Sequence, residues 1–147
     1  MSLRTFTSGW AYVSALLWLA IGTAVLQLWP ASYWFDVKRV YVSDPVLLGN
    51  AEMAVTREIK REFFARWHVT IKQWDGGWVS WCSANGAGNY TKQSKLPKHL
   101  DVAWWTTGQC PKMPLGKYYI TTVWNIEIPG LMPDKRIVVD SNVFDVR

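Results

Sequence analysis

Two cysteines and two histidines are the residues of this chain whose types suit redox or metal chemistry. Cys82 and Cys110 are its only cysteines. An even pair in one domain is most simply a disulfide, which on the chain-entropy model contributes on the order of 3 kcal/mol. Two free buried thiols in a cytosolic domain are the alternative. A zinc site that adds His68 and His99 lacks C-x-x-C and H-x-x-x-H spacing, so we expect no metal and no cofactor.

No group of residues has the spacing of a catalytic centre. The chain contains no G-x-S-x-G motif, and most of its aspartates lie where turns and strand ends use this residue anyway. His68 lies on the polar phase of an expected strand and His99 in a lysine-rich loop, and neither has a local partner that would make it a base. Gly86 and Gly88 form G-x-G, but no helix follows to bind phosphate. We therefore expect no enzyme and no catalytic residues.

Tryptophan is the residue type in excess, with 11 copies. Trp67 and Trp124 fall on the apolar phase of expected strands and are predicted to be core. Trp104 and its neighbour must point to opposite faces if the chain is extended there. Exposed aromatic side chains mark binding surfaces, for which a protein, a glycan or the membrane surface are the possible partners. The partner-binding candidates are Trp74, Trp78, Trp81 and Trp105.

The charge balance argues against nucleic acid as a partner. The chain has 16 Lys and Arg against 11 Asp and Glu, and the two signs are interspersed. Only one basic loop stands out, with Lys92, Lys95 and Lys98. Such a loop attracts anionic lipid headgroups or envelope polyanions weakly, and serves solubility in any case.

An uncharged stretch at residues 10–29 must position everything that follows. At about 1.5 Å per residue, a helix of this length covers roughly 30 Å, the hydrocarbon thickness of a bilayer. Amphipathic aromatics flank it as they flank membrane spans. We expect a short cytoplasmic N-terminus at 1–9, a transmembrane helix at 10–29, an interfacial linker at 30–34 and one extracytoplasmic domain at 35–147.

The orientation of the span depends mainly on the cysteines. Arg4 precedes the span, but Lys38 and Arg39 follow it closely, so the positive-inside signal is nearly balanced. A disulfide belongs outside the cytoplasm, which predicts a single-pass protein of the inner membrane with a periplasmic or other extracytoplasmic domain. A cleaved signal peptide is the alternative, because small residues at 20–24 have the spacing that signal peptidase reads.

The domain alternates between apolar and polar residues with the period of strands. The alternation over 55–71 favours two strands with a break near 61–64, with a helix over 51–63 as the alternative. Residues 75–77 predict a hairpin turn and residues 85–89 a further break. Residues 90–99 predict a surface loop, with a loop that includes a short edge strand as the alternative. Shorter strands are expected at 35–42, 78–83, 100–105, 136–140 and 143–146, and the clearest one at 117–127. Seven or eight strands without βαβ alternation predict a mainly β, antiparallel sandwich.

Two short motifs carry a resemblance to a known class of domain. Residues 116–124, with Gly116 and Tyr118, look like the penultimate strand of immunoglobulin-like and fibronectin-like sandwiches, and residues 141–146 resemble their closing strand. The resemblance implies that Tyr118 forms a corner with upstream backbone. The cysteines depart from the antibody pattern, since Cys110 precedes the Tyr118 strand. A short span followed by such a domain is also similar to small membrane proteins of unknown function from phages and prophages.

These features together lead to three expectations for function. The first is a membrane-anchored extracytoplasmic binding or assembly module that docks on another envelope or membrane protein. The second is a phage-derived interference protein that blocks an envelope receptor or channel. The third is a protein that binds or processes envelope polysaccharide.

Overall fold

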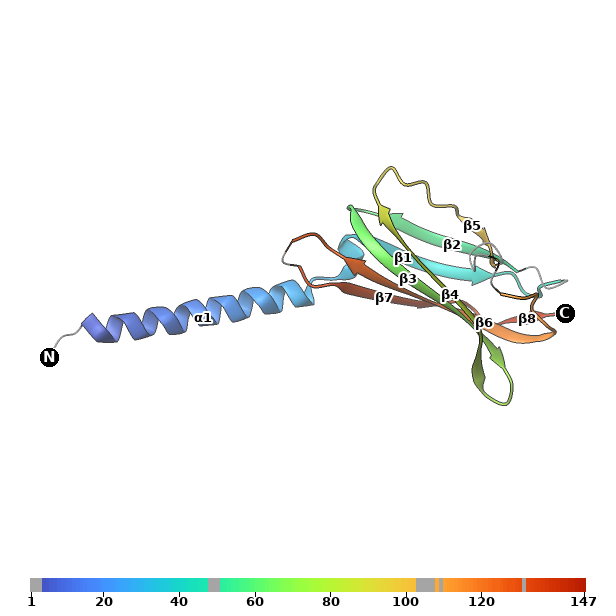
Figure 1. Ribbon diagram of the computed structural model, residues 1–147, viewed down its shortest axis with the longest axis horizontal. Helices are drawn as coiled ribbons and strands as arrows, with labels where there is room; N and C mark the ends of the chain where they lie inside the picture. Colours follow the sequence, from blue (N-terminus) through green and yellow to red (C-terminus); the bar gives the residue numbers. More distant parts are fainter. Residues whose placement is uncertain (1–3, 48–50, 103–107, 109, 131) are drawn as a thin grey trace.

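The computed structural model of the protein has one apolar helix followed by a mainly β domain (Figure 1). It describes residues 4–47, 51–102, 108, 110–130 and 132–147. The helix α1 (Arg4–Leu28) begins before the expected span and includes a segment, Gly9–Leu28, that is long and apolar enough to cross a membrane. None of this segment is buried by the rest of the chain.

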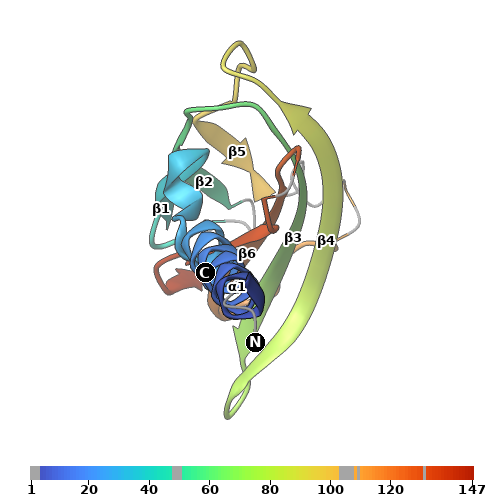
Figure 2. The ribbon, with the colours of Figure 1, turned by 90° about the vertical axis from the view of Figure 1, so that its left-hand side faces the viewer.

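Two antiparallel sheets make up the domain. The smaller sheet has the order β1-β2-β5, with β1 (Phe35–Val42), β2 (Glu52–Ile59) and β5 (His99–Asp101). The larger sheet has the order β4-β3-β6-β7, with β8 paired to the start of β6. Its strands are β3 (Phe63–Trp74), β4 (Trp78–Tyr90), β6 (Gly116–Glu127), β7 (Lys135–Asp140) and β8 (Phe144–Val146). Figure 2, which looks along α1, shows β4 at the outer rim of this larger sheet.

The period-2 pattern predicted most of these strands. The interpretation of residues 55–71 as two strands is confirmed by β2 and β3, so the helix over 51–63 is wrong. The hairpin turn at 75–77 is confirmed between β3 and β4. His99, expected in a loop, instead begins the short strand β5, while residues 103–107 of the strand expected at 100–105 lie outside the described residues.

The predicted break at 85–89 is wrong, because β4 runs without interruption through these residues. The reason lies on the neighbouring strand. Gly86 pairs with Trp67, and the six-membered ring of that indole occupies the space where a Cβ on Gly86 would stand. The glycine therefore permits close packing within the sheet and does not mark a turn.

Two clusters of buried side chains fill the space between the sheets. The first lies toward the C-terminal end and includes Val42, Met53, Ile71 and Phe144. The second lies toward the helix and contains Trp34, Phe35, Phe63, Ala65, Trp124 and Ile126. The alternation of β6 produces its inward row, since Tyr118, Ile120, Thr122, Trp124 and Ile126 are all buried.

Polar side chains join the last strands to the rest of the domain. The Tyr118 hydroxyl donates to the carbonyl oxygen of Pro114 at 2.8 Å, so the predicted contact with upstream backbone is present. The side-chain amide of Asn142 pairs with the backbone of β1 as an adjacent strand would. Its Oδ1 accepts from the Val42 N–H at 2.8 Å, and its Nδ2 donates to the Val42 carbonyl oxygen at 2.9 Å. The Asn142 contacts attach the segment between β7 and β8 to the smaller sheet.

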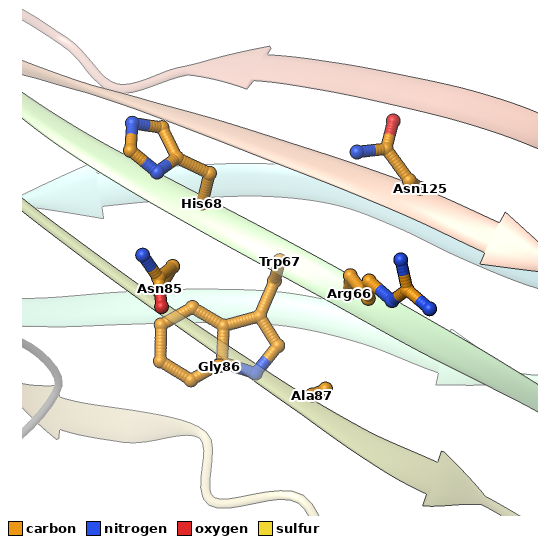
Figure 3. Close-up of a pocket in the computed structure, with 7 residues that line it drawn as sticks. All are labelled: Arg66, Trp67, His68, Asn85, Gly86, Ala87 and Asn125. Atoms are coloured by element: carbon orange, nitrogen blue, oxygen red, sulfur yellow. The ribbon is translucent and has the colours of Figure 1, made fainter.

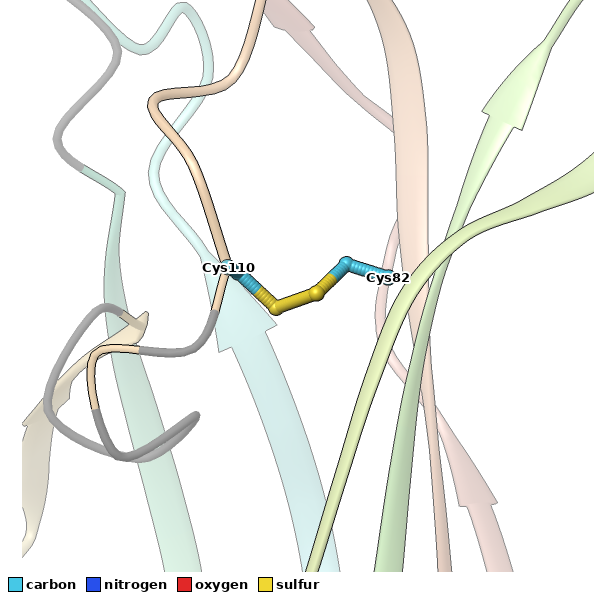
Figure 4. The surroundings of a disulfide bond; sticks show 2 residues. All are labelled: Cys82 and Cys110. Atoms are coloured by element: carbon cyan, nitrogen blue, oxygen red, sulfur yellow. A yellow bond between two sulfur atoms is a disulfide. The ribbon is translucent and has the colours of Figure 1, made fainter.

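The predicted disulfide is confirmed between Cys82 and Cys110, whose Cα atoms lie 5.8 Å apart (Figure 4). Cys82 is in β4, and Cys110 lies in the segment between β5 and β6. Cys110 also packs against the first core cluster. The bridge therefore attaches the edge strand of the larger sheet to the crossover that leads into its central strands.

The end of α1 is held by a side chain from the domain. The Lys135 ammonium, on a side chain that is almost fully buried, donates to the carbonyl oxygens of Leu26 at 2.8 Å and Gln27 at 2.7 Å. These carbonyls belong to the last turn of the helix, where no i+4 donor follows and where a cation is favoured by the helix dipole. The short 3-10 helix η1 (Ala31–Tyr33) then leads directly into β1.

Candidate functional site

The hairpin that joins β3 and β4 carries two of the predicted binding residues. Trp74 ends β3 and Trp78 begins β4, and the two are paired across the strands with ring centroids 5.3 Å apart. The turn between them closes with a hydrogen bond from the Asp75 N–H to the Gly77 carbonyl, and Gly76 takes a φ of 67° that favours glycine. Trp74 is 48% exposed and Trp78 is 39% exposed.

A tyrosine and a lysine extend the two indoles into a continuous surface. The Trp78 ring meets the Tyr119 ring edge-on, with centroids 4.6 Å apart. Lys72 donates to the Tyr119 hydroxyl at 2.8 Å, and its ammonium lies 5.1 Å from the centre of that ring. We call the set Trp74, Trp78, Tyr119 and Lys72 the hairpin cluster. It combines large aromatic area with one fixed cation.

Trp81 differs from the other two tryptophans of the hairpin. The register of β3 and β4 shifts between Ile71 and Lys72, so Trp81 is an extra residue on the β4 side. Its half-buried ring packs against the first core cluster, with its centroid 6.0 Å from that of Tyr118. A bulge changes which face of the sheet the following residues point to. Strict alternation along β4 therefore does not predict that Trp81 packs against the core while Trp78 is exposed.

The other predicted binding residues lie away from the hairpin cluster. Trp105 lies outside the described residues. Lys92, Lys95 and Lys98 are exposed in the loop between β4 and β5, as expected. This loop starts at the end of β4 opposite to Trp78, so the basic loop and the hairpin cluster do not form one surface.

The residues considered for metal or acid–base chemistry are dispersed. Cys82 and Cys110 are bonded to each other, and His99 pairs with Glu52 at 3.3 Å. His68 is exposed on the outer face of the larger sheet. Among the described residues no group of three His, Cys, Asp or Glu side chains converges on one point.

An arginine between the sheets was not singled out by its sequence. Arg57 in β2 places its guanidinium 5.9 Å from the centre of the Trp124 ring, and its Nε is buried without a hydrogen-bond partner among the described residues. Desolvation lowers the pKa of Arg57, and burial likewise raises the pKa of the nearby Tyr90 hydroxyl. The sequence did contain a signal for this burial. Arg57 lies two residues after the buried Val55, so the two side chains face the same side of β2.

The described part of the surface includes two open hollows. One, of about 390 Å³, lies over the larger sheet where β3, β4 and β6 meet (Figure 3). Its polar rim comes from Arg66, His68, Asn85 and Asn125. The other, of about 240 Å³, lies beside β2 and is lined by Ala54, Val55, Thr56, Arg57, Lys98 and His99. Neither of these two hollows has a nucleophile next to a base among the described residues that line it.

The position of the hairpin cluster relative to α1 is the most informative part of the geometry. Phe63, where β3 begins, follows residues whose backbone N–H groups bond to Trp34 next to the helix. β3 then runs for 12 residues, or about 40 Å, before it reaches Trp74. Figure 1 shows the β3–β4 hairpin projecting sideways from the half of the domain that is remote from α1, with β8 and the C-terminus farther along the direction of the helix. No protein-family model, curated protein or solved structure matches this chain.

Proposed function

We propose that this protein is a membrane-anchored, extracytoplasmic binding module that docks on another envelope or membrane protein through the hairpin cluster. The observation that carries the proposal is the exposed pair of Trp74 and Trp78 on a hairpin that projects from the half of the domain remote from α1. Large exposed aromatics in one patch are typical of interface anchors.

The distance from the helix favours a partner beyond the anchoring bilayer surface. With α1 spanning the membrane, the hairpin lies in the half of the domain remote from that surface, because the 12 residues of β3 lead obliquely away from the end of the helix. The anchoring bilayer is therefore a poor partner for the indoles, which leaves a protein or a glycan. The fixed Lys72 ammonium adds a charge-assisted contact that suits a protein surface with an acidic or carbonyl group.

Two further observations support the compartment and the anchor. The Cys82–Cys110 disulfide is typical of domains outside the cytoplasm. Lys135 holds the last carbonyls of α1, and cleavage at the small residues of 20–24 would remove most of the helix that this contact orients. The eight strands and the Tyr118 contact also fit an immunoglobulin-like sandwich, which we propose as the finer description of the fold.

A reporter fusion tests the orientation. Alkaline phosphatase fused after Arg147 should be active in a bacterial host, since it folds only outside the cytoplasm, and a cytoplasmic reporter at the same position should be silent. The reverse pattern would contradict both the orientation and the extracytoplasmic disulfide.

Site-specific photo-crosslinking in intact cells tests the docking surface. A photoreactive side chain at position 78 should give one discrete adduct with an envelope protein. The matched control is position 138 in β7, where Val138 is 53% exposed on the same sheet but away from the hairpin. Equal adducts from both positions would refute the hairpin cluster as the docking surface, and co-sedimentation of the protein with envelope polysaccharide in place of a protein adduct would identify a glycan partner.

A further inference from the structure

The end of the β domain beside α1 lies level with the last turn of the helix. The segment long and apolar enough to span a membrane is Gly9–Leu28. Lys135, the first residue of β7, donates to the carbonyl oxygens of Leu26 at 2.8 Å and Gln27 at 2.7 Å, and both carbonyls belong to that segment. An ammonium group is costly in hydrocarbon, and lysine side chains near the ends of membrane helices place it at the headgroups. With α1 in a bilayer, this end of the domain therefore meets the lipid headgroups.

A loop with little charge precedes Lys135 on the same side of the domain. Residues 128–134 join β6 to β7, and only the last of them, Asp134, is charged. Pro129 and Gly130 are exposed, while Ile128 and Met132 pack against the second core cluster. Figure 1 shows this loop beside the end of α1. Its position places the exposed residues of the loop against the headgroup layer.

Two aromatic side chains and an arginine form the rest of this surface. Trp29 directly follows α1, and its ring centroid lies 5.4 Å from that of Tyr33. The Arg61 guanidinium lies 4.0 Å from the centre of the Tyr33 ring. Trp and Tyr at the end of a span lie at the depth of the headgroups. The guanidinium stacked on Tyr33 is therefore at the depth of the lipid phosphates, and we call Trp29, Tyr33 and Arg61 the interfacial cluster.

Backbone contacts hold the turn that carries Arg61, but its charge is not neutralised within the described part of the chain. The N–H groups of Lys60 and Arg61 both donate to the Trp34 carbonyl oxygen, at 2.8 and 3.2 Å. Lys60 pairs with Asp36 at 3.3 Å, whereas Arg61 forms no ion pair among the described residues. A guanidinium offers parallel N–H donors that fit two oxygens of one phosphate.

We propose that this end of the domain rests on the bilayer surface, and that Arg61 binds the phosphate group of a phospholipid in the leaflet next to the C-terminal end of α1. The inference rests on the proposed function, because it uses the membrane anchor, and it adds the lipid contact that holds the domain. The exposed acids Glu62 and Asp134 adjoin Arg61 and Lys135 in the chain. The contact is therefore with a single phosphate, and the surface as a whole does not depend on a high content of anionic lipid.

Quenching by nitroxide-labelled lipids tests the surface with the full chain in nanodiscs. A fluorescent amino acid at position 129, in the loop between β6 and β7, should be quenched by a phospholipid that carries the nitroxide on its headgroup. The control is position 115, where Leu115 is exposed just before β6 starts, next to the pairing of Gly116 with Val146 and remote from α1. It should be quenched far less. Equal quenching at the two positions, or none at position 129, would overturn the inference.

Native mass spectrometry of the full chain in detergent micelles tests the phosphate contact. The probe is dioleoylphosphatidylglycerol, and dioleoylglycerol, which has the same acyl chains and no phosphate, is the matched lipid. Arg61→Gln should weaken binding of the probe by about tenfold, the change expected when one charge-assisted contact is lost, and should leave dioleoylglycerol binding unchanged.

Arg39→Gln is the matched control variant. Arg39 is also an exposed arginine stacked on a tyrosine, with its guanidinium 4.6 Å from the centre of the Tyr41 ring, but it lies four residues into β1 from the end beside α1. Tyr41 is 38% exposed and Tyr33 is 37% exposed, so the two sites differ mainly in their distance from the helix. An equal loss of probe binding in both variants, or no loss in Arg61→Gln, would overturn the phosphate contact.

A third label separates this inference from the proposed function. A fluorescent amino acid at position 19, in the middle of α1, should be quenched by a phospholipid with the nitroxide on its acyl chain. Failure at position 19 would contradict the membrane anchor of the proposed function, and the inference with it. Quenching at position 19 without quenching at position 129 would overturn the inference alone. Trp78→Ala, which removes part of the hairpin cluster, should leave probe binding unchanged.

Discussion

The two ends of the β domain use the same residue type in opposite ways. Near α1, Trp34 is 6% exposed and Trp124 is 3% exposed, and Trp124 contacts the rings of Phe35 and Tyr90. At the far end, the rings of Trp74 and Trp78 mainly contact each other and Tyr119. The tryptophan excess therefore has two causes: one group builds the core beside the helix, and the other forms a surface that no described part of the chain covers.

Replacement of a tryptophan from the end near the helix gives the largest expected effect. Trp124→Ala removes a buried ring from between Phe35, Trp67 and Tyr90, and should lower the free energy of unfolding by roughly 3 to 5 kcal/mol. Thermal unfolding of the intact protein in detergent measures the loss. A loss below about 1 kcal/mol would mean that this end does not depend on its aromatic core.

Removal of the disulfide tests what stabilises the far half of the domain. The double variant Cys82→Ser with Cys110→Ser should lose on the order of 3 kcal/mol, because the bridge restricts the unfolded chain over a sequence separation of 28 residues. Reduction of the wild-type protein should lower the free energy of unfolding by the same amount. The neighbouring variant Ser83→Ala, at an exposed position, is the control and should change little.

The local patterns of the sequence were sufficient for most of the strands. The alternation of β6 predicted that Trp124 faces the core, and Asp75 followed by two glycines predicted the hairpin, because both signals lie within a few residues of the feature they specify. The disulfide was predictable because Cys82 and Cys110 are the only two cysteines of the chain and lie in the same domain. These are the cases in which local preference and the final fold agree.

The features that sequence reasoning missed depend on residues far apart in the chain. The glycines of 85–89 were interpreted as a break because nothing in that stretch shows the indole of Trp67 that requires Gly86. The core contact of Trp81 follows from a bulge set by its pairing with β3. The cap that Lys135 provides joins residues 108 positions apart. The candidate site was predictable as a set of tryptophans, but its exposed members needed the register.

The Lys135 contact fixes the end of the domain near the helix, and its loss should affect orientation more than folding. Lys135→Met removes two charge-assisted hydrogen bonds to α1, which weakens the attachment of helix to domain by about 2 kcal/mol. The distribution of distances between spin labels at positions 19 and 138, measured in nanodiscs, should become broader. Arg136→Met, on the exposed side of the same strand, should leave the distribution narrow. An unchanged distribution in the first variant would show that the contact does not orient the domain.

Alkaline pH should weaken the far half of the core through Tyr118. Burial raises the pKa of this hydroxyl above its ordinary value of 10.0. Tyr118 in the unfolded chain loses its hydroxyl proton at a lower pH than Tyr118 in the folded chain. The free energy of unfolding is therefore highest below about pH 10 and falls as the pH rises further. Tyr118→Phe should lose about 1 kcal/mol at neutral pH, with its Pro114 hydrogen bond, and should show a flatter decline above pH 10. Urea unfolding across this range measures both, and a parallel decline in the two proteins would refute the role of Tyr118.

Replacement of an exposed tryptophan at the far end gives the smallest expected effect on folding and the sharpest test of the comparison. Trp74 is 48% exposed, and among the described residues its ring pairs with that of Trp78 across the hairpin. Trp74→Ala should therefore change the free energy of unfolding by about 0.5 kcal/mol or less, the usual range for surface substitutions. The same change should weaken partner binding by about 2 kcal/mol or more if the indole is an interface anchor. Thermal unfolding and quantified crosslinking of this variant, beside Trp124→Ala, measure the two effects separately. A stability loss as large as that of Trp124→Ala would place Trp74 in the core and remove the distinction between the two ends of the domain.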